Sequence, residues 1–111
     1  MNEVVSLDPV DVAEVTILVD NSVDVLLPSS PGVQRAPLHY DWSKRDPLIA
    51  EHGYALLLTV TREGRRETIL YDAGLGRDTA THNADVLGLR LRDVCSVVLS
   101  YGHVDHHGGL E

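Results

Sequence analysis

The sequence predicts an α+β protein whose sheet is mostly antiparallel. Short apolar runs of strand length alternate with Gly-, Pro- and Asp-containing turns along its 111 residues. Two successive runs are joined by a short charged turn, which favours antiparallel pairing, and another stretch has apolar residues at helical spacing. Hydrophobic residues make up 43% and charged residues 23% of the chain, which is typical of a globular domain.

The N-terminal part is expected to supply one strand and a long loop. Residues 1–13 are acidic and lack periodicity, so we expect a loose lead-in to a domain that spans 14–111. A β-branched run at 15–19 predicts the first strand. Residues 23–27 suit either a second short strand or an extended segment, and the Pro-containing stretch 28–47 predicts a long surface loop.

A β-hairpin is predicted in the middle of the chain. Residues 54–60 form the most apolar run and predict a buried strand. The charged stretch 62–66 is short enough to be a hairpin turn, so residues 67–71 are expected to return as the antiparallel partner.

A helix and a further strand are expected to follow. Asp78 suits the N-cap of a helix over 79–87, and Gly88 suits the left-handed residue after its end. The apolar run 94–99 predicts another buried strand, and Cys95 within it is expected to pack in the core.

Charge and composition exclude several classes of partner. The net charge is −8, so neither nucleic acid nor an anionic membrane is expected as a partner, because phosphate binding needs clustered cations. The chain has no window of ~18 apolar residues and no secretory signal at its start. A single cysteine excludes an internal disulfide and suits a reducing compartment, so a cytoplasmic location is expected.

Histidines gather at the C-terminus in a pattern that suits a metal. His103, Asp105 and His106 follow the last apolar run. Glycines flank them, at 102 before and at 108–109 after. Imidazole and carboxylate are the ligands that zinc prefers, and iron and manganese also use them. A bound metal lowers the pKa of its water to ~7 and so supplies hydroxide. The alternative is a solvated polar loop that binds nothing.

These residues also carry a resemblance to a known family. Residues 100–110 resemble the metal-binding motif of the metallo-β-lactamase fold superfamily, His-x-His-x-Asp-His-x-Gly-Gly. The chain is similar to one branch of it, the proteins related to 7,8-dihydropterin-6-methyl-4-(β-ribofuranosyl)aminobenzene 5′-phosphate synthase. The stretches that support the branch are 15–21, 50–53, 68–74 and 82–85.

The resemblance implies a fold and a set of metal ligands. The chain would form the N-terminal half of an αββα sandwich and stop just after the motif loop. His103 would serve the first of two zinc ions, and Asp105 and His106 the second, with Asp105 also holding the nucleophilic water. Asp72 matches an aspartate that braces the motif loop, and its alternative role is to form the turn before Ala-Gly.

The sequence departs from the family motif at its first position, where Tyr101 replaces the leading histidine. A phenol has a pKa of ~10, so its ionisation at neutral pH opposes metal binding. The family's remaining ligands lie beyond residue 111, and neither metal site reaches the three protein ligands that a catalytic zinc needs. We therefore expect weak or absent zinc binding by this chain alone. An alternative is a single metal held by Tyr101, His103 and His106.

Two functions from different classes follow. The first is a relative of metal-dependent hydrolases or dihydropterin-type transferases, with an incomplete site and no activity by itself. Its substrate would be a small molecule, pterin-like or phosphorylated. The second is a non-enzymatic remnant, or a half-domain that associates with a complementary chain through its uncovered sheet.

Overall fold

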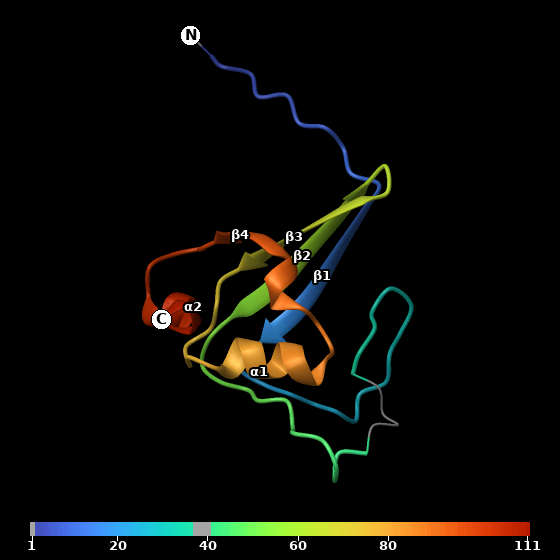
Figure 1. Cartoon of the computed structure of the whole chain (residues 1–111), viewed down its shortest axis with the longest axis vertical. Coiled ribbons are helices and arrows are strands. Elements are labelled where there is room, and N and C mark those ends of the chain that lie inside the picture. The colour runs from blue at the N-terminus through green and yellow to red at the C-terminus, as the bar shows by residue number, and fades with distance from the viewer. Residues whose placement is uncertain (1, 37–40) are drawn as a thin grey trace.

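Four strands form one sheet in the computed structural model, which describes residues 2–36 and 41–111 (Figure 1). The strand order is β1-β2-β3-β4; β1 pairs with β2 and β2 with β3 antiparallel, whereas β3 and β4 are parallel. The mostly antiparallel prediction is confirmed, and the few helices are compatible with a small α+β domain. The strands are β1 (Val12–Val19), β2 (Ala55–Arg62), β3 (Arg65–Tyr71) and β4 (Val94–Val98).

The predicted hairpin is present between β2 and β3. Arg62 pairs with Arg65, so Glu63 and Gly64 alone form the turn. Both turn residues have positive φ, 50° and 77°, as the twist of a two-residue hairpin turn requires. The predicted turn spanned 62–66, but Arg62, Arg65 and Arg66 belong to the strands, so the hairpin is longer than predicted.

The first strand begins earlier than the apolar pattern indicated. β1 starts at Val12, which pairs with Thr61, because the long β2 offers backbone partners beyond residue 60. Asp11 extends this pairing: its N–H donates to the Thr61 carbonyl at 2.8 Å, and its carboxylate accepts the Glu63 N–H at 2.9 Å.

The connection between β1 and β2 loops out at one end of the sheet (Figure 1). Residues 23–27 form no strand. In the described part of 28–47 we find an isolated bridge between Ser30 and Val33 and otherwise irregular chain, as predicted. Residues 37–40 of that predicted loop lie outside the described residues.

Helix α1 (Thr79–Val86) covers one face of the sheet. Ala80 and Ala84 on the helix pack with Leu18, Leu57 and Leu70 from three strands to form the core. The remaining helices are shorter, at three or four residues: η1 (Leu91–Asp93), α2 (Val104–His107) and η2 (Gly108–Leu110). In the described ranges, none of the helices has the length and apolar character needed to cross a membrane.

The ends of α1 lie within one residue of their predicted positions. Gly88 has φ 71°, the left-handed conformation expected after the helix. Asp78 occupies the predicted N-cap position, but its side chain makes no capping hydrogen bond. Glu51 takes the role instead: its carboxylate accepts the Gly76 N–H at 3.2 Å and the Thr79 hydroxyl at 2.7 Å.

A buried amide joins α1 to the loop before β2. Asn83 is 1% exposed, and its Nδ2 donates to the carbonyls of Leu18 at 2.8 Å and Ile49 at 2.9 Å. Its Oδ1 accepts the Ile49 N–H at 2.9 Å. These bonds satisfy a buried polar group and hold the end of the long connection beside the sheet.

The last strand is not buried, which corrects the prediction for 94–99. β4 is exposed along most of its length, and Cys95 is exposed rather than in the core. The reason is topological. β4 forms one edge of the sheet, while α1 packs against β1 at the other edge.

The sheet has a second face that is apolar and open to solvent. The strand register places Leu57 and Leu70 on the face under α1, so their neighbours along each strand point to the opposite side. On that side Val15 is 61% and Ile17 53% exposed. We call this the open face; its residues are Val15, Ile17, Leu56, Leu58, Ile69, Tyr71 and Val98.

Candidate functional site

The histidine-rich segment after β4 folds back onto the sheet. This motif loop, residues 100–111, contains α2 and η2, so part of the predicted loop is helical. The Ala73 N–H donates to the His106 carbonyl at 2.7 Å, and the Tyr54 N–H to the Asp105 carbonyl at 3.3 Å. These bonds place α2 beside the segments that precede β2 and follow β3 (Figure 1).

The double glycine permits this close approach. A Cβ at Gly108 would collide with the carbonyl of Leu75, and one at Gly109 with the carbonyl of Ala73. Both obstacles are backbone atoms, which cannot move aside as a flexible side chain can. The glycines are therefore needed for the packing of the motif loop against the end of β3.

Asp72 holds the motif loop in place through hydrogen bonds. It follows β3 with φ 58° and is 1% exposed. Its Oδ1 accepts the Ser100 N–H at 2.7 Å, and its Oδ2 lies 2.6 Å from both the Ser100 hydroxyl and His106 Nδ1. The predicted bracing contact and the turn conformation are thus both present at one residue.

Hydrogen bonding determines the charge state of Asp72. Burial acts to raise the pKa of this carboxyl, but the bonds from the Ser100 hydroxyl and N–H and the contact with His106 outweigh it. The net effect lowers the pKa of Asp72 below its usual value. An ionised Asp72 accepts a hydrogen bond from His106 Nδ1–H, which leaves the lone pair of Nε2 directed away from Asp72.

Asp105 lies between two imidazoles. Its Oδ2 is 3.4 Å from His106 Nε2 and 3.4 Å from His52 Nε2. Sequence reasoning matched Glu51-His52-Gly53 to the family branch but assigned no role to His52. Its approach to Asp105 depends on two loops 53 residues apart in sequence, which no local pattern reveals.

Tyr101 and His103 form a separate pair. The Tyr101 hydroxyl lies 2.9 Å from His103 Nδ1, and the ring centroids are 4.5 Å apart. The Tyr101 ring also contacts the ring of His106, at 4.8 Å between centroids. The residue that replaces the first motif histidine therefore engages the second.

The predicted metal ligands come together only in part. Among residues 2–36 and 41–111, no three His, Cys, Asp or Glu side chains stand ready to hold one metal ion. Asp105 Oδ2 and His106 Nε2 do present an oxygen and a nitrogen toward a common position, which suits zinc as two ligands of a set. The Nδ1 atom of His103 contacts the Tyr101 hydroxyl instead.

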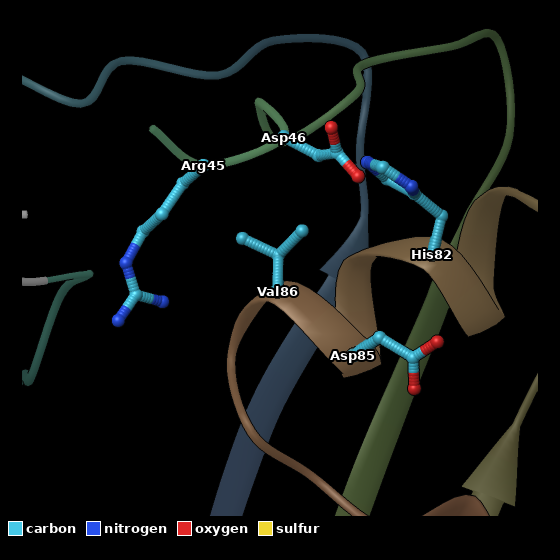
Figure 2. A pocket seen from close by; sticks show the side chains of 5 residues that line it. All are labelled: Arg45, Asp46, His82, Asp85 and Val86. Atoms are coloured by element: carbon cyan, nitrogen blue, oxygen red, sulfur yellow. The ribbon is translucent and has the colours of Figure 1, made fainter. Parts of the chain in front are cut away.

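A surface hollow lies elsewhere, between α1 and the chain before β2. Figure 2 shows it, with the Asp46 carboxylate turned toward the ring of His82. The His82 ring nitrogen Nε2 lies 2.7 Å from the Pro47 carbonyl oxygen. The hollow is lined by Arg45, Asp46, His82, Asp85 and Val86, and it contains no residue of the motif loop.

Comparison with known proteins gives a weak link to pterin chemistry. No model of a protein family matches the sequence. A segment of 64 residues, 58% of the chain, is 30% identical to the 7,8-dihydropterin-6-methyl-4-(beta-D-ribofuranosyl)-aminobenzene-5'-phosphate synthase of Methanocaldococcus jannaschii. The matched segment spans 22% of that synthase. The branch expected from the motif is supported in this coarse sense, and the metallo-β-lactamase architecture stays a prediction.

Proposed function

We propose that the chain carries part of a metal-dependent site of the metallo-β-lactamase type, with Asp105 and His106 as metal ligands. The site would act in hydrolysis or group transfer on a small, pterin-like or phosphorylated molecule. The observation that carries the proposal is the arrangement Asp72–His106–Asp105, in which one carboxylate orients an imidazole toward a second carboxylate.

The Asp72 contact supports the ligand role of His106. Metal-binding histidines almost always donate their second ring N–H to a carboxylate or carbonyl, which fixes the tautomer and raises the basicity of the ligating nitrogen. Asp72 Oδ2 lies 2.6 Å from His106 Nδ1 and so meets this requirement.

The similarity to a dihydropterin-related synthase supports the class of substrate. When bound, the metal would supply Lewis-acid polarisation and a water with a pKa near ~7. With Asp105 and His106 alone, affinity would be weak and the chain inactive by itself, because catalytic zinc sites use three protein ligands. The resemblance assigns His103 to the other metal, where Tyr101 replaces its partner.

Zinc titration by calorimetry tests the proposal. We expect saturable zinc binding by the full chain and its loss in His106→Gln and Asp105→Asn. His82→Gln is the matched control, because His82 is bound to the Pro47 carbonyl and lies outside the motif loop. Binding that survives His106→Gln, or no binding by the unsubstituted chain, would contradict the proposal.

The open face favours a second function, that of a half-domain. Its occupant would be a complementary polypeptide that brings a second apolar sheet, since two such faces pack together at about 10 Å. The apolar character of Leu56, Leu58 and Ile69, on the strands beside the exposed Val15 and Ile17 of β1, supports this choice. So does the greater length of the matched synthase, of which the aligned segment spans 22%.

Association and dye binding test the half-domain. Sedimentation velocity is expected to show concentration-dependent self-association in the absence of the partner, and the dye ANS is expected to bind the exposed apolar surface. Ile17→Lys places a charge on the open face, at a residue that is 53% exposed, and should lower both signals. A monodisperse monomer that leaves ANS fluorescence unchanged would argue against a half-domain.

A further inference from the structure

We propose that His52 supplies a third protein ligand to the ion held by Asp105 and His106. This inference rests on the proposed function. It assigns to the site a residue from outside the histidine-rich motif, and it differs from the motif-based assignment of His103.

The backbone on both sides of His52 is anchored to the site. Before it, the Glu51 carboxylate accepts the N–H groups of Leu75 at 2.9 Å and Gly76 at 3.2 Å. After it, the Tyr54 N–H donates to the Asp105 carbonyl at 3.3 Å. His52 is therefore held on a short bridge between the loop after β3 and the motif loop.

Gly53 allows this bridge to lie against the motif loop. A Cβ at that position would lie 2.9 Å from the carbonyl oxygen of Asp105 and 2.9 Å from the amide nitrogen of Leu75. Both atoms belong to the backbone, so a side chain would push the two segments apart. The close approach is what brings His52 within reach of the Asp105 carboxylate.

The distances at Asp105 match the edges of a tetrahedral metal site. Metal–ligand bonds of ~2.0–2.1 Å at tetrahedral angles separate neighbouring ligand atoms by about 3.3–3.4 Å. His52 Nε2 and His106 Nε2 each lie 3.4 Å from Asp105 Oδ2. The hydrogen-bonded Asp72–His106 pair is much closer, at 2.6 Å.

The chemistry of the atoms points the same way. An ionised Asp72 accepts a hydrogen bond from His106 Nδ1–H, so Nε2 and the Asp105 carboxylate are both acceptors, and a cation between them would satisfy both. The His52 side chain is 80% exposed, which leaves its ring free to rotate. Although no ready three-ligand group exists in the described residues, that rotation would close one around an ion.

His103 is the contrasting candidate. It belongs to the motif, but its Nδ1 lies 2.9 Å from the Tyr101 hydroxyl, and the two exposed rings are tilted by 37° against each other. The two histidines thus make opposite predictions. If the motif determines the ligands, replacement of His103 should weaken binding of the ion at Asp105 and His106. If the fold determines them, replacement of His52 should weaken that binding.

Zinc and cobalt titrations of the full chain separate these possibilities. The variants are His52→Gln, His103→Gln and His106→Gln, with His82→Gln as the matched control outside the motif loop. Calorimetry gives zinc affinity, and the visible absorption of bound Co²⁺ reports the number and kind of its ligands. Circular dichroism verifies that each variant is folded.

We expect His52→Gln to weaken zinc binding at least about tenfold and to alter the Co²⁺ spectrum. His103→Gln and His82→Gln should change affinity less than about threefold, because neither would contact the ion. If His106→Gln abolishes binding while His52→Gln binds like the unsubstituted chain, the inference falls and the proposed function stands. If the unsubstituted chain binds no metal, or His106→Gln has no effect, both fall.

Discussion

Replacement of Asp72 by asparagine isolates the charge that braces the motif loop. Asparagine tolerates the positive φ of 58° and keeps an oxygen for the Ser100 N–H. What it loses is the ionised Oδ2, which lies 2.6 Å from the Ser100 hydroxyl and 2.6 Å from His106 Nδ1. The substitution therefore changes two charge-assisted hydrogen bonds and little else.

The size of the effect follows from those two bonds. A hydrogen bond to a charged group contributes ~1.5–3 kcal/mol and a neutral one ~0.5–1.5 kcal/mol, so each loses about 1–1.5 kcal/mol. We expect Asp72→Asn to lower the free energy of unfolding by about 2–3 kcal/mol, a large part of the ~5–15 kcal/mol of a small domain. Urea unfolding followed by circular dichroism measures this free energy. The slope of the free energy against urea concentration should stay unchanged.

The same substitution should impair metal binding through the His106 tautomer. The new amide N–H would donate to His106 Nδ1 and move the ring proton to Nε2, the nitrogen that faces Asp105. Zinc affinity should fall about 10–100-fold, the usual effect of losing such a supporting contact. Asp78→Asn is the control, because that side chain makes no capping bond. An Asp72→Asn variant as stable as this control, or one that binds zinc normally, would refute the reasoning.

Further predictions concern the same loop and the exposed sheet. Because the pKa of Asp72 is lowered in the folded chain, its contribution to stability is complete above the unfolded pKa of about 4 and is lost as pH falls through the folded value; the urea midpoint of Asp72→Asn should lack that acid decline. Gly108→Ala should destabilise the fold by about 1–3 kcal/mol, because its Cβ meets the Leu75 carbonyl, whereas Gly102→Ala, with open space around it, should be nearly neutral in the same unfolding assay. Cys95 should react with a thiol reagent in the native chain, and a thiol that reacts only after denaturation would contradict its exposure. Tyr101→His should raise zinc affinity in calorimetry by restoring an imidazole beside His103, and no gain would count against the incomplete-site account.

Local signals in the sequence were sufficient for the hairpin and the end of the helix. Glu63 and Gly64 adopt the positive φ that a two-residue turn requires, and Gly88 does so after α1. These features depend on a few neighbouring residues and on backbone sterics. Local patterns therefore predicted the β2–β3 pairing and the place of α1 within a residue or two.

Tertiary position decided the features that were predicted wrongly. An apolar run predicts a strand but not how many neighbours cover it, so the edge position of β4 and the exposure of Cys95 were not evident. Asp78 lies at the N-cap as predicted, but the side-chain hydrogen bonds at the helix start come from Glu51, which local sequence did not reveal. The contact of His52 with Asp105 also joins distant parts of the chain, so the sequence assigned His52 no role.

The central claim is that His106 is oriented by Asp72 to present Nε2 to a metal beside Asp105. The most direct measurement is ¹⁵N NMR of the histidine ring nitrogens of the full chain during zinc addition. We predict that His106 carries its proton on Nδ1 before zinc is added, and that zinc shifts the Nε2 resonance while Nδ1 stays protonated. A His106 ring protonated at Nε2, or one whose nitrogens do not respond to zinc, would contradict the claim.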